Sequence, residues 1–233
     1  MINVNFRTIL NSIFVLNLKN IPTMTILKTS VAKKMAMALS GLFLVLFILV
    51  HLAINLTLIY PGKEAFDAAV EFMATNPFIQ IMQPVLFLGF IFHIGMGIYL
   101  EWTNQSKRSV KYVNNNPGAA SSWASRNMIW TGLFVLLFLI IHLLNYFVPF
   151  KTQDIPDHYA LVTGLFKSPV YTLLYVLAFI ALAIHLSHGF QSAFQSLGTP
   201  REKCNKALVI TGKIIALLVA FGFSAIAIYF YFN

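Results

Sequence analysis

Residues 42–54 read LFLVLFILVHLAI, a run of apolar side chains interrupted by a single histidine, His51. This run lies within a longer apolar stretch, 36–60, and about 20 helical residues are enough to cross the hydrocarbon core of a bilayer. An imidazole in hydrocarbon is costly, so a histidine inside a membrane-spanning segment indicates a functional site. We therefore predict a transmembrane helix here, with His51 as a candidate binding residue.

The whole chain has the composition of a polytopic membrane protein. Of its 233 residues, 58% are hydrophobic and only 10% are charged, whereas soluble domains carry about 25% charged residues. Five apolar stretches are long enough to span, and the connections between them leave no room for a soluble catalytic domain. We predict an all-α fold, a single bundle of five transmembrane helices at about 36–60, 78–101, 127–149, 169–195 and 208–232.

The basic residues indicate the topology of the chain. The net charge is +9, and the cytoplasmic stretches carry most of it if the amino terminus is cytoplasmic, as the positive-inside rule requires. Those stretches hold Arg7, Lys19, Lys28, Lys33, Lys34, Lys107, Arg108, Lys111, Arg126, Arg201, Lys203, Lys206 and Lys213, and the outer connections hold Lys63, Lys151 and Lys167. This distribution argues against nucleic-acid binding, and it leaves a basic inner face that suits a cytoplasmic partner.

Each of the first four predicted spans carries one deep histidine: His51, His93, His142 and His185. With a rise of about 1.5 Å per residue, alternating helix directions place His51 level with His142 towards the outside and His93 level with His185 towards the cytoplasm, roughly 14 Å apart. Neutral imidazole is a good axial ligand of haem iron, and its second nitrogen can donate to a backbone carbonyl one turn earlier. We predict two bis-histidine sites that each hold one haem b.

Other roles for the histidines stay open. A single buried histidine is more often a helix–helix hydrogen bond than a ligand, and a set of them can form a proton relay, although relays usually include membrane carboxylates. His188 follows His185 by three residues and is an alternative ligand, a partner of a haem propionate or an interfacial residue. His158, in the second outer connection, is expected to be solvated, with a role at a quinone site as the alternative.

The remaining segments are assigned from composition. Residues 1–34 are expected to form a cytoplasmic amino-terminal segment, in which 1–23 fits so poorly that we interpret it as non-native or as an interfacial appendage. Residues 35–233 are the five-helix membrane domain, with a short amphipathic piece in the connection 61–77. The single cysteine, Cys204, excludes intrachain disulfides and a thiolate-held iron–sulfur cluster. We expect no internal repeat beyond the shared placement of the histidines.

With these residues the chain resembles the five-helix type of di-haem cytochrome b membrane subunit found in succinate dehydrogenases and fumarate reductases. The resemblance covers about residues 24–232 and rests on the four span histidines and on three short motifs. The motifs are Lys33-Lys34 before Ser40-Gly41-Leu42-Phe43, the run Leu49-Val50-His51-Leu52, and the segment His185-Leu186-Ser187-His188-Gly189-Phe190. In the family a glycine follows the fourth-helix ligand by four residues, and that spacing selects His185 over His188.

The resemblance implies a complex in the bacterial inner membrane. A flavoprotein with covalent FAD and an iron–sulfur subunit would dock on the cytoplasmic face, and menaquinone would bind near the outer haem. This chain would carry electrons, with no succinate or fumarate chemistry of its own. Quinone-site candidates, by position or chemistry alone, are Glu71, Glu64, Asp67, Gln80 and Gln83, and candidates for the inner haem propionates are Lys107, Arg108, Arg126 and Ser40. The rival interpretations are the cytochrome b of another quinone-linked oxidoreductase, such as a hydrogenase or a formate dehydrogenase, and a haem-free transporter or structural anchor.

Overall fold

The computed structural model describes residues 29–106, 127–199 and 205–233, and every regular element in these ranges is helical. Cys204, Lys107, Arg108, Arg126 and the segment 1–23 lie outside the described residues. The elements are α3 (Ser30–Leu56), α4 (Lys63–Thr75), α5 (Pro77–Ser106), α8 (Met128–His142), the π-helical turn η1 (Leu143–Phe147), α9 (Val148–Thr152), α10 (His158–Leu165), α11 (Pro169–Ser196) and α12 (Asn205–Phe232).

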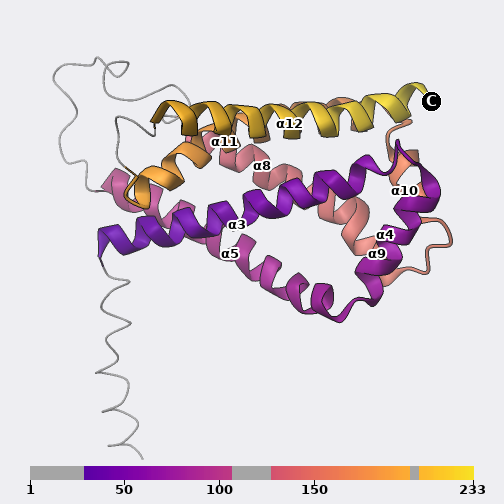
Figure 1. The fold of residues 1–233 in the computed structure, drawn as a ribbon, viewed down its shortest axis with the longest axis horizontal. Coiled ribbons are helices and arrows are strands. Elements are labelled where there is room, and N and C mark those ends of the chain that lie inside the picture. The colour runs from indigo at the N-terminus through magenta and orange to yellow at the C-terminus, as the bar shows by residue number, and fades with distance from the viewer. Residues whose placement is uncertain (1–28, 107–126, 200–204) are drawn as a thin grey trace, which may run out of the picture.

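Five helical segments are long and apolar enough to cross a membrane: α3, α5, the continuous stretch Met128–Thr152 formed by α8, η1 and α9, α11, and α12. They alternate in direction along the bundle, with α4, α9 and α10 gathered at one end (Figure 1). We call this end the α4–α10 end and the other the opposite end. The predicted all-α, polytopic fold with five spans is confirmed.

The first span is shifted relative to the prediction, because it begins at Ser30 and ends at Leu56 rather than covering 36–60. At its start, the Thr29 side chain accepts a hydrogen bond from the Ala32 amide, which is a helix N-cap. At its end, the side chains of Asn55 and Thr57 bond to backbone carbonyls. Such bonds compete with continuation of a helix. Residues 30–34, which were expected in the amino-terminal segment, are thus continuous with the helix of the first span.

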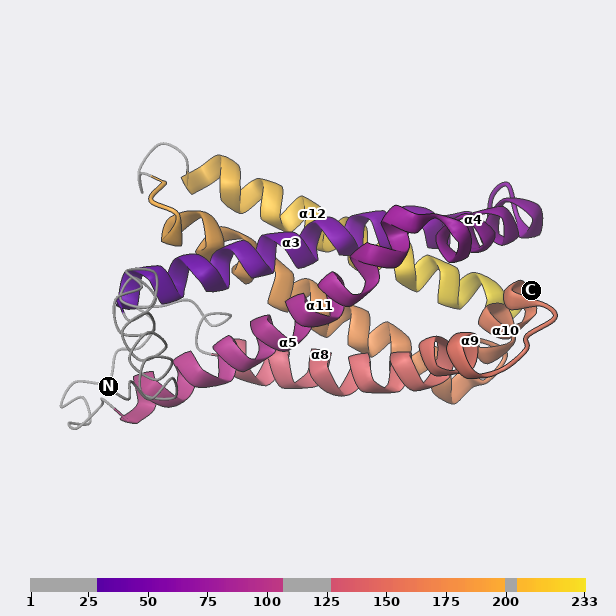
Figure 2. The same cartoon turned by 90° about the horizontal axis from the view of Figure 1, so that it is seen from below.

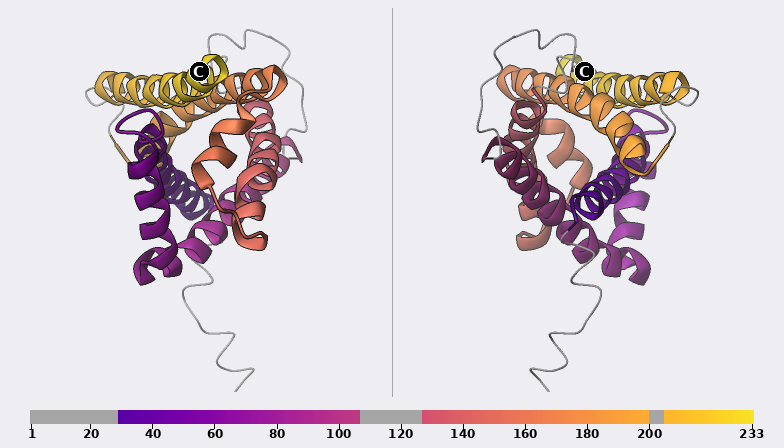
Figure 3. Two further views of the ribbon diagram at one scale, coloured as in Figure 1. Left: turned by 90° about the vertical axis from the view of Figure 1, so that its right-hand side faces the viewer. Right: turned by 90° about the vertical axis from the view of Figure 1, so that its left-hand side faces the viewer.

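The buried core of the bundle centres on α11, which packs against α12, α3 and α8. Tyr175 on α11 and Val219 on α12 are 1% and 0% exposed, respectively. Figures 2 and 3 show α12 lying along one side of the bundle with α5 on the other. No residue of α5 is fully buried among the described residues, so α5 is the most peripheral span.

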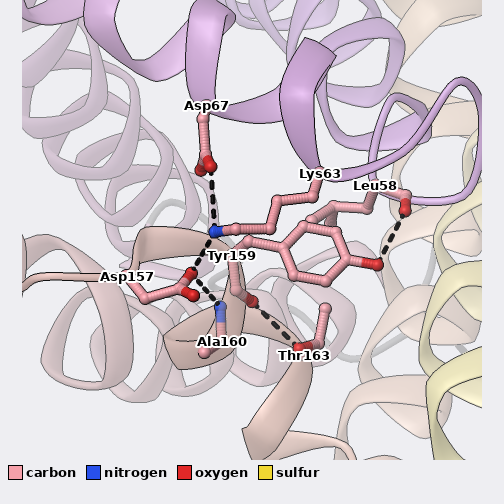
Figure 4. Close-up of polar contacts among 7 residues, drawn as sticks. All are labelled: Leu58, Lys63, Asp67, Asp157, Tyr159, Ala160 and Thr163. Carbon is pink, nitrogen blue, oxygen red and sulfur yellow. Dashed lines mark hydrogen bonds and ion pairs between the residues drawn. The ribbon is translucent and has the colours of Figure 1, made fainter.

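Ion pairs and hydrogen bonds join α4 to α10 at the α4–α10 end (Figure 4). The Lys63 ammonium lies 2.6 Å from Asp157 and 2.9 Å from Asp67, while Asp157 also caps α10 by accepting from the Ala160 amide. Because Lys63 donates to it, the pKa of Asp157 is lowered from its ordinary value, and the same contact raises the pKa of Lys63. The predicted amphipathic piece in 61–77 is helix α4, with Phe66 as its buried anchor.

Candidate functional site

The first histidine pair joins α5 to α11. The rings of His93 and His185 lie with their centroids 6.5 Å apart and their planes at 80°. His188, one turn further along α11, is half-buried, and it is His185 whose ring faces His93. We refer to these two residues as the 93/185 pair.

The second pair joins α3 to α8. The rings of His51 and His142 have centroids 5.8 Å apart and planes at 88°. The structure therefore brings together the same residues that depth along alternating helices had paired. We refer to them as the 51/142 pair.

Two glycines give the spacing between the pairs. A Cβ on Gly41 of α3 would lie 3.2 Å from Cε1 of His93, and a Cβ on Gly132 of α8 would lie 3.4 Å from Cε1 of His185. Each glycine precedes the histidine of its own helix, His51 or His142, by ten residues. A helix rises about 1.5 Å per residue, so the two pairs are about 15 Å apart along the bundle.

Aromatic rings surround the 51/142 pair. Phe47 stacks against the His51 ring at 5.3 Å, and Phe138 and Tyr146 lie 5.7 and 5.3 Å from the His142 ring. Nδ1 of His142 is buried and has no hydrogen-bond partner among the residues that the structure describes, so the expected bond to a carbonyl one turn earlier is not made there. A buried ring nitrogen left unpaired costs about 1–3 kcal/mol, and a bound group that meets it would remove that cost.

The polar surroundings of the 93/185 pair differ. The Ser40 hydroxyl lies 3.2 Å from Nδ1 of His93, and the Thr131 hydroxyl lies 3.4 Å from Nδ1 of His185. These contacts come from the facing helix in each case, rather than from a carbonyl of the histidine's own helix. From the sequence, Ser40 was predicted to contact a haem propionate rather than a histidine ring, and Thr131 was not among the predicted site residues.

Both pairs fit the axial ligation of a haem iron. Two imidazoles that each bound one metal ion at about 2 Å would have their ring centroids up to about 6 Å apart. The measured separations are 5.8 and 6.5 Å. Two imidazoles are the number of protein ligands that an iron held by a macrocycle takes in its axial positions.

The other predicted site residues lie away from the rings. Glu64 and Glu71 are exposed on α4, Asp67 is held by the Lys63 ion pair, and Gln80 donates to the Ala74 carbonyl. His158 was expected to be solvated, but it is half-buried, with its ring 4.8 Å from that of Phe150. The ring contact with Phe150, at the end of the third span, accounts for the difference.

The expectation of no internal repeat is wrong. Residues 37–51 read MALSGLFLVLFILVH and residues 128–142 read MIWTGLFVLLFLIIH, with the same Met, Gly, Leu, Phe, Leu, Phe and His in register. The hydroxyl before the glycine, Ser40 or Thr131, is also shared in type. The partner helices repeat as well, because a glycine follows His93 and His185 by four residues in each. Comparing the two histidine spans directly would have revealed both the repeat and the importance of Thr131.

The fold is that of an integral-membrane helix bundle in which two pairs of histidine rings lie close together, one pair above the other. The family model described as the succinate dehydrogenase/fumarate reductase transmembrane subunit matches residues 106–222, just over half of the chain. The chain belongs to this family and is a membrane subunit of a succinate dehydrogenase/fumarate reductase complex. No curated protein and no solved structure matches it.

Proposed function

We propose that this chain is the five-helix, di-haem cytochrome b subunit of its complex. It would carry electrons through the bacterial inner membrane between an iron–sulfur subunit and menaquinone. The two histidine pairs, about 15 Å apart along one bundle, are the observation that carries this proposal. His93 and His185 would hold the haem b nearer the opposite end, and His51 and His142 the one nearer α4 and α10.

The haems would supply one-electron redox chemistry at each level. The chain's own contribution is to orient the imidazoles and exclude water. Phe47, Phe138 and Phe223 enclose the 51/142 rings at centroid distances of 5.3 to 5.8 Å. An apolar enclosure of this kind keeps solvent from the metal and so helps to set its potential.

The ends of the bundle suit different partners. The described residues at the opposite end include Lys33, Lys34, Lys206 and Lys213, a basic surface on which an iron–sulfur subunit and a flavoprotein with FAD would dock. The amino terminus would then be cytoplasmic, in accord with the positive-inside rule. Menaquinone would bind towards the α4–α10 end, nearer the 51/142 pair.

A reduced-minus-oxidised spectrum of the purified complex, with a pyridine haemochrome count, tests the proposal. We expect two haems per chain, one lost in His93→Ala and the other in His51→Ala. His188→Ala is the matched control, because it removes a half-buried imidazole from the same helix as His185 and should retain both haems. A wild-type complex without a Soret band would refute the proposal and favour histidines that only bridge helices.

A further inference from the structure

The hydroxyls of Ser40 and Thr131 make equivalent contacts with the two rings of the 93/185 pair. The Ser40 hydroxyl donates to the Met37 carbonyl at 3.0 Å and lies 3.2 Å from Nδ1 of His93. The Thr131 hydroxyl donates to the Met128 carbonyl at 3.0 Å and lies 3.4 Å from Nδ1 of the His185 ring. Each contact spans two helices, from α3 to α5 and from α8 to α11.

Counting protons assigns the donor in these contacts. A hydroxyl has one proton and two lone pairs. Since the proton of each hydroxyl goes to the carbonyl of its own helix, the oxygen can only accept from the imidazole, so Nδ1 carries the hydrogen. A neutral imidazole protonated at Nδ1 has its lone pair on Nε2, the nitrogen that is then free to bind a metal.

The repeated helices also hold these rings in place sterically. His93 and His185 lie directly against Gly41 and Gly132, where a Cβ would approach within 3.2 and 3.4 Å. One turn earlier, the methyl carbons of Met37 and Met128 lie 3.5 and 3.4 Å from the Cβ positions of the glycines on the partner helices, Gly97 and Gly189. The methionine, hydroxyl and glycine of each repeat therefore contact the partner helix in the same register.

The 51/142 pair has different neighbours. The Asn55 amide nitrogen lies 3.5 Å from both ring nitrogens of His51 and donates to the carbonyl of the same residue at 2.8 Å. An amide nitrogen only donates, so it cannot accept a proton from Nδ1. Within the described residues, Nδ1 of His142 has no hydrogen-bond partner. The hydroxyl acceptors are therefore a feature of the 93/185 pair.

We propose that Ser40 and Thr131 are positioning residues of the 93/185 pair. Each accepts the Nδ1 hydrogen of the facing histidine, fixes its tautomer and ring rotation, and so presets this pair for haem iron more strongly than the 51/142 pair. The inference rests on the proposed haem function. A hydrogen bond to the second ring nitrogen also increases the basicity of the ligand, which favours the oxidised iron.

The experiment compares shape-matched variants in the assembled complex. Thr131→Val removes the hydroxyl and keeps the branched shape, whereas Thr131→Ser keeps the hydroxyl, and Ser40→Ala is paired with Ser40→Thr in the same way. We expect Thr131→Val and Ser40→Ala to weaken retention of one haem about 10-fold. They should also raise its reduced-to-oxidised ratio at fixed potential about 2- to 10-fold, the effect of one lost hydrogen bond. The other haem, identified as the one that remains in His93→Ala, should be unchanged.

Thr103→Ala controls for the loss of a hydroxyl, because Thr103 makes the same bond to a carbonyl three residues earlier on α5, at 3.0 Å. Both hydroxyl-retaining variants should behave as wild type. Equal effects on the two haems, or no effect of Thr131→Val and Ser40→Ala on retention and potential, would overturn the inference. A wild-type complex without haem would instead refute the proposed function, so the two failures are distinguishable.

Discussion

Gly41→Ala tests whether the histidine rings are seated directly on helix backbone. The added methyl would lie 3.2 Å from Cε1 of His93, a distance at which the neighbour must move by a few tenths of an ångström. The ring has little freedom to do so, because Ser40 holds its Nδ1 at 3.2 Å. Overpacking of this kind costs about 1–3 kcal/mol, and the gain from replacing a helical glycine by alanine is about 1 kcal/mol.

Subtracting the gain from the overpacking cost leaves a net cost of about 0–2 kcal/mol for Gly41→Ala. We expect this cost to weaken haem binding at the 93/185 pair. Since 1.4 kcal/mol is a factor of ten, we expect that haem to dissociate up to about 30-fold more readily in Gly41→Ala. Haem release from the detergent-purified complex, followed by Soret absorbance, is the assay. Gly95→Ala is the matched control, because a Cβ there meets nothing within 4 Å, and it should retain both haems and gain stability. Both variants gain helix propensity, so they differ by the overpacking cost of about 1–3 kcal/mol; equal haem release and equal thermal stability of Gly41→Ala and Gly95→Ala would refute the close seating of the ring.

Three further changes probe the packing of the bundle. Asp157→Asn should lower the melting temperature slightly at low salt and hardly at all at high salt, because the ion pair is exposed. The pKa of this carboxyl is lowered in the folded protein. The ion pair should therefore stabilise the wild-type protein at a pH above the ordinary pKa of an aspartate, and this stabilisation should disappear as the pH falls through the lowered pKa. Gly222→Ala places a Cβ 2.8 Å from Cδ1 of Leu52 and should cost about 1–3 kcal/mol in thermal unfolding, and a double variant with Leu52→Ala should lose less than the sum of the two single changes. Tyr175→Phe removes the oxygen that accepts from the Asn145 amide at 3.1 Å and should cost about 1–3 kcal/mol; unchanged chemical denaturation would show that this amide has another partner.

The parts of the structure that follow from regular helix geometry could be predicted from the sequence. Apolar length identified the five spans, and a fixed rise per residue with alternating directions was enough to pair His51 with His142 and His93 with His185. Neither inference needed to know how any helix is rotated about its axis.

The parts that depend on rotation and local side-chain bonds could not be predicted in this way. The contacts of Ser40 and Thr131 with the rings require a particular rotation of α3 and α8. The π-helical turn at Leu143–Phe147 contains no proline or glycine, and Pro149, two residues beyond it in the same helical stretch, indicates a distortion of the helix but not its π-helical form. The turn follows His142 directly and coincides with a buried tyrosine, Tyr146, whose hydroxyl lies 3.4 Å from the Val162 carbonyl on α10.

The repeat has a consequence for assembly. Each pair takes one histidine from the α3–α5 half and one from the α8–α11 half, so neither half contains a complete site. A group bound by either histidine pair would link the two halves. A ligand that binds only when the two halves are packed together stabilises the packed form by mass action. Insertion of two such groups would therefore complete the docking of two similar helical hairpins, in the way that a ligand shared across a subunit boundary completes a dimer.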